Sequence, residues 1–457
     1  MKCVVLAAGR GSRLARRGRP KPLVPVLGLP LLERTIATAA AAGLDDFCVV
    51  TGYAAAMVDD LLVGVAARRR VNITIARTDN WAAGNGTSLL AARAFLGEYF
   101  VLLVGDHVFD PELLAGLVHQ GPTGDSVVVA ADFGLDRPTM VDPDDATKLL
   151  IRNQRVVEIG KQLPHYNAYD AGLFKCRPAV FSALEASGRD GDHSLTGGFR
   201  RLACCGAVGA FDVGDHGWVD VDAANSLRAA KRVLRQGLPK PGDGAISRTI
   251  NRPVSTRVLT PLLLRCFPTI TPNQVSILGL LVAIAAAGSF LAASPVAGGL
   301  LVALASILDG SDGETARLKY MQTSFGAYLD ATLDRYADSI IIAAMGIYAV
   351  RTTSNTASGS GLWTSVAVAV SLLALIGSQM RSYTSVRSIV DLGYRYRARW
   401  IAAGRGRDVR LFTLSVGGVA AAIPAADPAA VMAALAIVGL VANGVVGARL
   451  WESWHNV

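Results

Sequence analysis

Residues 309–334 read DGSDGETARLKYMQTSFGAYLDATLD, and they set four aspartates in an otherwise apolar part of the chain. Asp309 and Asp312 are three residues apart and Asp330 and Asp334 are four apart, so each pair shares a helix face. Carboxylates in or near a bilayer are costly unless they face an internal polar cavity and bind a cation. Mg²⁺ commonly bridges carboxylates and substrate phosphates. The stretch therefore predicts a metal site between two helices of a membrane domain.

The apolar segments around this stretch predict six membrane spans. They lie near residues 273–293, 296–317, 325–350, 362–384, 409–425 and 429–449, and most approach the ~20 residues that cross a bilayer core. The connection 381–410 contains eight arginines, whereas the loops expected on the opposite side carry almost no charge. The positive-inside rule then predicts an inner (plasma) membrane protein whose front part, arginine-rich connection and C-terminus are cytoplasmic.

Charge divides the chain into two halves. The 457 residues are 51% hydrophobic and only 18% charged, and the mean hydropathy is +0.38. Residues 1–257 contain 31 Lys/Arg and 26 Asp/Glu, against 14 and 10 in residues 258–457. The front is thus typical of a globular enzyme and the back of a membrane domain. This composition excludes a disordered, collagen-like or disulfide-stapled protein. The net charge of +9 is spread over both halves and does not indicate a nucleic-acid partner.

The first 230 residues alternate β-rich runs with helical patterns, which predicts a Rossmann-like α/β domain with a mainly parallel sheet. Strands are expected at 3–8, 47–51, 72–76, 99–104, 126–131, 155–159, 171–174 and 207–212, and helices at 31–42 and 88–96. We expect a cytoplasmic domain over 1–235, a linker and the start of an interfacial segment over 236–257, and a membrane domain over 258–457. Residues 258–264 predict an amphipathic helix on the membrane surface.

A glycine-rich loop follows the first expected strand. Residues 6–14 read LAAGRGSRL, and Lys21 follows between two prolines. Backbone N–H groups in such a loop can cradle phosphates, and Arg13 and Lys21 add two basic anchors. A dinucleotide-binding loop is a weaker interpretation, because Leu14 stands where the third glycine is needed.

Residues 309–334 match all eight fixed positions of D-x2-D-G-x2-A-R-x8-G-x3-D-x3-D, and thereby resemble the CDP-alcohol phosphotransferase family. Over roughly residues 250–450, this resemblance implies that an acceptor hydroxyl cleaves a CDP-alcohol and releases CMP. It implies metal binding by Asp309, Asp312 and Asp330, with Mg²⁺ as the metal and Mn²⁺ as an alternative. Asp334 would be the general base. The cytidine-diphosphate pocket would be formed by Gly313, Ala316, Arg317 and Gly326.

Three residues near this signature have open interpretations. Arg381 and Arg387 resemble the basic positions that hold an acceptor phosphate in family members that use phosphorylated inositol. The alternative is ordinary positive-inside charge. Asp338 lies one turn beyond Asp334 and outside the signature, and we interpret it as structural or supporting.

The front loop resembles the signature of the sugar-phosphate nucleotidyltransferases, which add an NTP to a phosphorylated alcohol or sugar and release pyrophosphate. The resemblance implies a phosphate loop of Leu6, Ala7, Ala8, Gly9 and Gly11, with Arg13 and Lys21 as catalytic residues. It further implies metal binding by Asp106 with Asp220 or, as second choice, Asp222. Asn85 and Ser88 would read base and ribose, and Lys161 would lie near the acceptor phosphate. The alternatives are helix capping for Asn85 and Ser88, a solvated surface role for Lys161, and a structural rather than catalytic role for His107.

The two families fit together chemically, because one makes a CDP-alcohol and the other consumes it. The order resembles the family of fused enzymes that join an inositol-1-phosphate cytidylyltransferase to a di-myo-inositol-phosphate-phosphate synthase. This implies CTP, inositol-1-phosphate and CDP-inositol as ligands, a compatible solute as product, and a homodimer in the bilayer. One departure is the short, arginine-rich segment from Arg13 to Pro20. The alternatives are another phospho-alcohol, a lipid CDP-alcohol or acceptor, or a non-catalytic membrane anchor or transporter.

Overall fold

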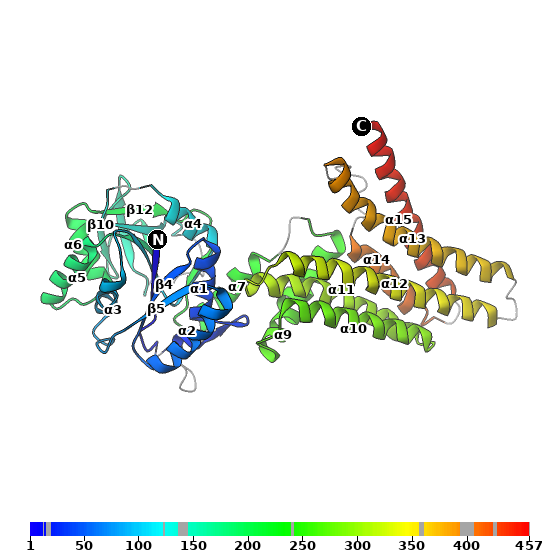
Figure 1. Ribbon diagram of the computed structural model, residues 1–457, viewed down its shortest axis with the longest axis horizontal. Coiled ribbons are helices and arrows are strands. Elements are labelled where there is room, and N and C mark those ends of the chain that lie inside the picture. Colours follow the sequence, from blue (N-terminus) through cyan, green and yellow to red (C-terminus); the bar gives the residue numbers. More distant parts are fainter. Residues whose placement is uncertain are drawn as a thin grey trace. The chain divides into compact units, whose positions relative to one another are not determined.

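The computed structural model describes residues 1–11, 13–14, 20–121, 124–135, 145–238, 242–355, 361–393, 406–423 and 427–456. The chain forms two compact units, Met1–Gly237 and Leu238–Val457, and Figure 1 shows the elements of each. Residues 15–19 of the arginine-rich departure lie outside the described residues. So do four arginines of the predicted cytoplasmic connection, namely Arg395, Arg397, Arg399 and Arg405.

The first unit is built on a nine-stranded sheet with the order β5-β4-β1-β6-β11-β8-β12-β10-β9. Its strands are β1 Lys2–Leu6, β4 Asp46–Thr51, β5 Asn72–Arg77, β6 Phe100–Val104, β8 Val127–Asp132, β9 Lys148–Arg152, β10 Arg155–Gly160, β11 Ala168–Cys176 and β12 Val208–Asp212. Two small sheets pair β2 Pro25–Val26 with β3 Leu29–Pro30, and β7 His107–Phe109 with β13 Trp218–Asp220. β10 and β11 run antiparallel to their neighbours, so the sheet that the sequence predicts as mainly parallel is mixed.

Helices cover both faces of this sheet (Figure 1). One face carries α1 Leu31–Ala41, α2 Ala55–Arg69 and α4 Pro111–His119, and the other carries α3 Asn85–Ala91, α5 Ala179–Arg189 and α6 Leu195–Cys204. Short helices η1 Lys21–Leu23 and η2 Arg93–Phe95 and the later α7 Ala224–Gln236 complete the unit. Within β1, Val4 packs into one core and Val5 into the other. A strand buried on both faces reads as a continuous apolar run, which is why the sequence located it.

The second unit is helical. It begins with a continuous helical stretch of η3 Ser247–Asn251, α8 Arg252–Val254, η4 Ser255–Leu259 and α9 Thr260–Cys266. The longer helices are α10 Pro272–Leu291, α11 Pro295–Leu318, α12 Ser324–Asn355, α13 Gly361–Leu392, α14 Arg407–Ala420 and α15 Ala429–Asn456. Small residues allow close packing: a Cβ added at Gly299 of α11 would lie 2.7 Å from the carbonyl oxygen of Ser415 in α14.

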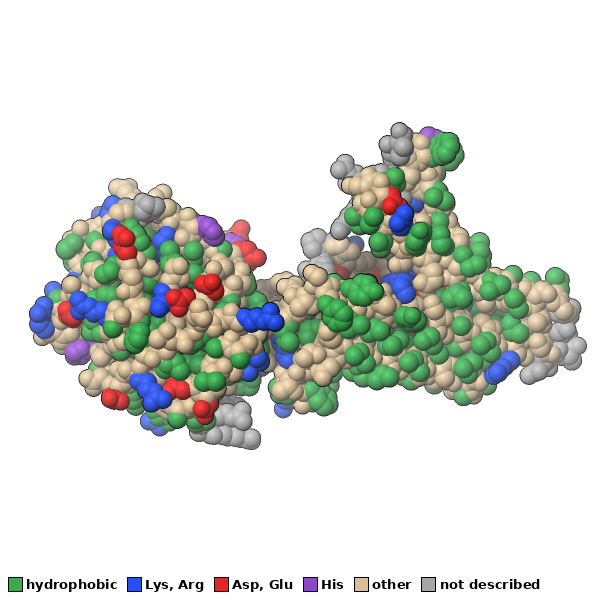
Figure 2. All heavy atoms as spheres, viewed as in Figure 1, with side chains coloured by type: hydrophobic (Ala, Val, Ile, Leu, Met, Phe, Trp, Pro, Cys, Tyr) green, Lys and Arg blue, Asp and Glu red, His purple; other side chains and the backbone are tan. Residues whose placement is uncertain are grey.

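Four of these helices are long and apolar enough to cross a membrane by length and composition: Pro272–Leu291, Pro295–Leu318, Gly361–Leu392 and Ala429–His455. Figure 2 shows hydrophobic side chains over the visible face of this unit, whereas charged side chains are frequent on the first. The other two predicted spans fall on α12, which carries Asp330 and Asp334 of the aspartate motif, and on α14, which has 14 residues. Six spans therefore stay a prediction, as does the membrane-surface helix.

Candidate functional site

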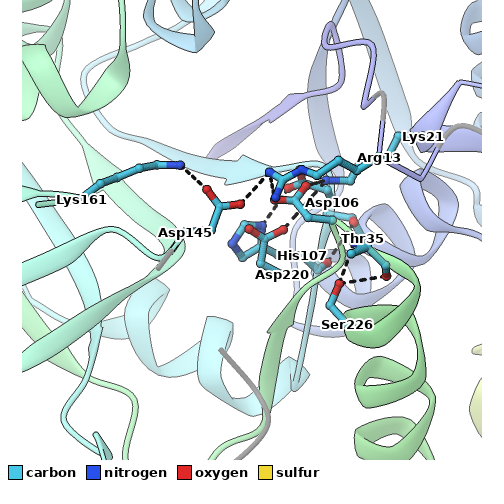
Figure 3. A network of polar contacts seen from close by, with 11 residues as sticks. Arg13, Lys21, Thr35, Asp106, His107, Asp145, Lys161, Asp220 and Ser226 are labelled. Carbon is cyan, nitrogen blue, oxygen red and sulfur yellow. Dashed lines mark hydrogen bonds and ion pairs between the residues drawn. The ribbon is translucent and has the colours of Figure 1, made fainter. Parts of the chain in front are cut away.

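The first candidate site lies at the carboxyl ends of β1 and β6. These strands are parallel neighbours, so the loops that follow Leu6 and Val104 meet at one edge of the sheet. The β7–β13 pairing sets Asp220 opposite His107. The cavity there measures about 600 Å³, and its lining includes Arg13, Asn85, Asp106, His107, Asp145, Lys161, Asp220 and Asp222. Figure 3 shows the network of polar contacts that includes Arg13, Lys21, Asp106, Asp145 and Lys161.

Lys21 lies at the centre of the acidic residues of this site. Its Nζ is 2.5 Å from Asp106 Oδ2 and 3.9 Å from Asp220 Oδ1, and it donates a hydrogen bond to Asp222 Oδ1. Burial alone would lower the pKa of Lys21, but the negative charges of the three aspartates outweigh burial and raise that pKa above its ordinary value. Gly11 has a φ of +60°, and a Cβ there would clash with the Lys21 side chain. The loop therefore depends on glycine at this position.

Asp106, His107 and Asp220 offer ligand atoms that lie within 4.8 Å of one another. Burial raises the pKa of Asp220 to about 6, and its Oδ1 accepts no hydrogen bond from the described residues. His107 Nδ1 lies 2.8 Å from Asp106 Oδ1. Burial alone would lower the pKa of His107, but the charge of Asp220 and the hydrogen bond with Asp106 raise that pKa to about 9. Two carboxylates with an unused buried oxygen fit a hard divalent cation.

Asp145 bridges two cations that the sequence assigns to different phosphates. Its Oδ2 lies 2.6 Å from Arg13 Nη2, and its Oδ1 lies 2.6 Å from Lys161 Nζ (Figure 3). Arg13 also reaches Asp222 at 3.2 Å. Sequence reasoning did not single out Asp145, which follows other acidic residues in no recognisable motif. The site thus joins Arg13 and Lys161 through one carboxylate.

The remaining predicted residues of the first unit are held in local structure. Leu6, Ala7 and Ala8 are buried, and Gly9 and Gly11 follow them in the loop after β1. Asn85 Oδ1 accepts a hydrogen bond from the backbone N–H of Leu195, the first residue of α6, at 2.8 Å. Ser88 is buried, and its Oγ donates to the carbonyl oxygen of Gly84 at 3.4 Å. Asn85 lines the cavity, whereas Ser88 is engaged within α3.

The second candidate site is a cavity of about 410 Å³ in the helical unit. α11 supplies the first part of the 309–334 signature and α12 the second. All eight signature positions line the cavity: Asp309, Asp312, Gly313, Ala316, Arg317, Gly326, Asp330 and Asp334. Ser255 and Arg252, which lie 54 and 57 positions before Asp309, line it as well.

Three carboxylates in this cavity could share one metal ion. Asp309, Asp330 and Asp334 offer oxygens within 4.8 Å of one another. Asp312 Oδ2 instead accepts a hydrogen bond of 2.6 Å from Ser276 Oγ in α10. An all-carboxylate donor set suits hard divalent cations such as Mg²⁺ and Mn²⁺. The residues present therefore fit the metal that the signature implies.

Two arginines of α14 enter this acidic region, and sequence reasoning counted both only as loop charge. Arg407 Nη1 lies 2.6 Å from Asp309 Oδ1 and 2.6 Å from Asp334 Oδ1. Its Nε lies 2.8 Å from Asp338 Oδ1, and Arg410 Nη2 lies 2.8 Å from Asp338 Oδ2. Asp338 therefore has both oxygens paired. Its structural role in the sequence analysis becomes a specific one, which is to hold Arg407 beside the signature.

Glu314, an unspecified position of the signature, anchors the helical stretch 247–266. Its side chain is completely buried. Oε1 accepts from Ser255 Oγ at 2.6 Å and from Arg252 Nη1 at 3.0 Å, and Oε2 accepts from Thr260 Oγ1 at 2.6 Å. Arg252 also donates to both carboxylate oxygens of Asp243 at 3.0 Å. This network holds one wall of the cavity.

Arg381 and Arg387 lie in different environments. Arg381 is buried, and its Nη1 and Nη2 have no hydrogen-bond partner among the described residues. The positive charges of Arg410, Arg449 and Arg335 repel the Arg381 guanidinium. Arg387 is half-exposed, and its Nε lies 2.7 Å from Asp391 on the next turn. A buried guanidinium without a partner is a ready anion site, whereas Arg387 is already paired.

Family models match both units. The MobA-like NTP transferase domain matches residues 3–186, and the CDP-alcohol phosphatidyltransferase family matches residues 269–441. The inositol-1-phosphate CTP transferase from T. maritima is a similar solved structure, with 25% identity, a TM-score of 0.46 and coverage of 52% of this chain and 98% of that one.

Two curated relatives are similar along most of the chain. A bifunctional IPC transferase and DIPP synthase of Rubrobacter xylanophilus is 39% identical over 426 residues, which cover 92% of this chain and 91% of the relative. A protein of the same description from Archaeoglobus fulgidus is 32% identical over 91% of this chain and 78% of its own length. Since the similarity runs through both units and their motifs, the chain belongs to the family of bifunctional IPC transferases and DIPP synthases.

Proposed function

We propose that this chain is a bifunctional enzyme that makes CDP-inositol in its first unit and consumes it in its second. The observation that carries the proposal is the presence of two carboxylate-rich cavities, one in each unit, within one chain of this family. The overall product is di-myo-inositol-phosphate-phosphate, a phosphodiester. The by-products are pyrophosphate from the first reaction and CMP from the second.

In the first reaction, a phosphate oxygen of inositol-1-phosphate attacks the α-phosphorus of CTP, and the bond to the β-phosphate breaks. Arg13 and Lys21 bind the triphosphate and hold the charge that moves onto pyrophosphate. Lys161 binds the acceptor phosphate, and the phosphate loop with Asn85 and Ser88 orients the nucleoside. Asp106 and Asp220, with Asp222 beside them, would hold Mg²⁺, which when bound neutralises phosphate charge.

In the second reaction, Asp334 accepts a proton from a hydroxyl of a second inositol-1-phosphate. That oxygen attacks the phosphorus attached to inositol in CDP-inositol, and CMP leaves with the electrons of the broken pyrophosphate bond. Asp309, Asp312 and Asp330 would hold the metal, and Gly313, Ala316, Arg317 and Gly326 line the cytidine-diphosphate pocket. Arg381, with the arginines around it, binds the acceptor phosphate, and Arg387 is a weaker contributor because it is already paired.

The second unit is proposed to sit in the inner (plasma) membrane as a homodimer with six spans, and both active sites face the cytoplasm. Four helices of sufficient length and apolarity support the membrane placement. The stretch 247–266 exposes Ile250, Val254, Val258 and Leu262 at a spacing of four residues, which supports an apolar face on the bilayer surface.

The test is to incubate membranes that contain the protein with CTP, Mg²⁺ and inositol-1-phosphate, and to follow the products by ³¹P NMR. We expect a pyrophosphate signal from CDP-inositol and then a phosphodiester signal. Parallel reactions replace inositol-1-phosphate with phosphocholine, or supply a lipid CDP-alcohol. Turnover of those substrates alone, with no phosphodiester from inositol-1-phosphate, would contradict the proposed substrate.

A further inference from the structure

In the second site, the Arg407 guanidinium contacts carboxylates that could also bind a divalent metal ion. Arg407 Nη1 contacts one oxygen each of Asp309 and Asp334 at 2.6 Å. The same two residues, with Asp330, form the three-carboxylate group able to hold a metal ion. A guanidinium and a divalent cation that share two carboxylates repel each other and divide the same negative charge.

Arg407 is held firmly in this position. Its side chain is 12% exposed, and its Nε is fixed by Asp338, whose side chain is 2% exposed and whose second oxygen is held by Arg410. Among the described residues, Asp334 also forms an ion pair with Arg335, whose Nη2 is 4.0 Å away, and the carboxylates of Asp309, Asp330 and Asp338 lie near enough to repel it. Arg407 is thus a preorganised counter-ion rather than a chance surface contact. Burial restricts its side chain, and so do ion pairs with Asp309 of α11 and Asp338 of α12.

We propose that Arg407 is an internal counter-ion that competes with the divalent cation for Asp309 and Asp334 and thereby sets the metal affinity of the second site. Without metal, Arg407 neutralises carboxylates that would otherwise repel one another across the gap between α11 and α12. When metal binds, the guanidinium gives up at least part of its contact with these two residues. Asp338 is the positioning residue for Arg407. The inference rests on the proposed metal dependence of this site.

The experiment measures metal binding rather than turnover. Mn²⁺ is titrated into the full-length protein in detergent, and free Mn²⁺ is followed by EPR. All samples carry Asp106→Ala, so that the first unit does not contribute its own carboxylate site. Mn²⁺ binding at the second site is identified as the binding that is lost when Asp330→Asn is added.

Arg407→Gln is expected to bind Mn²⁺ on the order of tenfold more tightly, because it removes a positive charge beside the proposed metal ligand Asp309 and the adjacent carboxylate of Asp334. Arg407→Lys should fall between the two, since one ammonium group cannot reach Asp309, Asp334 and Asp338 together as a guanidinium does. Arg351→Gln is the matched control. It removes the same charge from an exposed position of α12, and its Mn²⁺ affinity should not change.

Equal or weaker Mn²⁺ binding by Arg407→Gln overturns the inference, since Arg407 would then orient the ligands instead of competing with the metal. Thermal unfolding identifies a glutamine variant that does not fold. In that case the lysine variant decides, and unchanged or weaker binding by it has the same meaning. If no Mn²⁺ binding depends on Asp330, the proposed metal dependence of the second site is wrong, and the inference falls with it. If Asp330-dependent binding is present but Arg407→Gln does not tighten it, only the inference is wrong.

Discussion

At the scale of single residues, both sites combine aspartates with a buried or half-buried cation. In the first unit Lys21 contacts Asp106, Asp220 and Asp222, and in the second Arg407 contacts Asp309 and Asp334. Such pairing offsets part of the mutual repulsion of the clustered carboxylates without bound substrate, because opposite charge nearby favours the ionised form. Each site therefore carries its own neutralising charge before phosphate or metal arrives.

Asp106→Ala tests the division between the units at one residue. Asp106 is a proposed metal ligand and a partner of Lys21. Loss of a residue that only supports a metal ligand costs roughly 10–100-fold in activity. The rate of CDP-inositol formation should therefore fall by more than that in Asp106→Ala. Formation of phosphodiester should return when CDP-inositol is supplied with inositol-1-phosphate, measured by ³¹P NMR. Failure of this rescue in folded protein would contradict the assignment of the two reactions to separate sites.

Gly172→Ala tests the packing around His107. Gly172 has a φ of +76°, and a Cβ there would lie 2.5 Å from His107 Nε2. Gly214 is the matched control, because its φ is +61° and a Cβ there meets nothing within 4 Å. Gly214→Ala should cost only the ~1–2 kcal/mol of left-handed backbone strain. Gly172→Ala should cost more and should also slow CDP-inositol formation. Equal unfolding temperatures for the two variants would argue against a tight fit at His107.

At the scale of elements, the signature helix α11 has two roles. One face presents Asp309 and Asp312 to the cavity, while Glu314 holds the stretch 247–266 through Arg252 and the hydroxyls of Ser255, Thr256 and Thr260. The sequence predicts a linker and interfacial segment there, and the structure packs Asn251 and Ser255 in buried positions. Their partners lie more than 50 residues away, and local spacing carries no information about such contacts.

Glu314→Ala should destabilise the helical unit by about 3–5 kcal/mol, because it leaves the charge of Arg252 and three hydroxyls without their buried acceptor. Thermal unfolding in detergent measures the loss, and proteolysis should become faster within residues 243–266. Asp391→Ala, which removes the carboxylate of an exposed pair with Arg387, should change stability by no more than about 0.5 kcal/mol. A Glu314 variant as stable as the Asp391 variant would show that this anchor is dispensable.

Prediction from sequence succeeded where a pattern is local. The buried strands β1, β4 and β6 read as continuous apolar runs, and the eight signature residues that share a fixed spacing line one cavity. The three-residue strands β7 and β13 are too short to show a period. Arg407 could not be assigned to the site, because its ion pair with Asp309 joins residues 98 positions apart.

At the scale of the whole molecule, the chain combines two units that have separate cores and separate cavities. Chemistry couples them, since the CDP-alcohol released by one is the substrate of the other. The low charge content of residues 258–457 follows from this organisation. An apolar helical unit retains few acidic residues, and four of the ten in that half lie in its proposed active site.

The central claim is that one chain makes and then consumes CDP-inositol, and Asp334→Asn tests it most directly. The variant removes the proposed base of the second reaction and leaves every residue of the first unit unchanged. With CTP, Mg²⁺ and inositol-1-phosphate, followed over time by ³¹P NMR, CDP-inositol should accumulate at the wild-type initial rate while the phosphodiester stays absent. Loss of both products in folded protein, or an undiminished phosphodiester signal, would contradict the account.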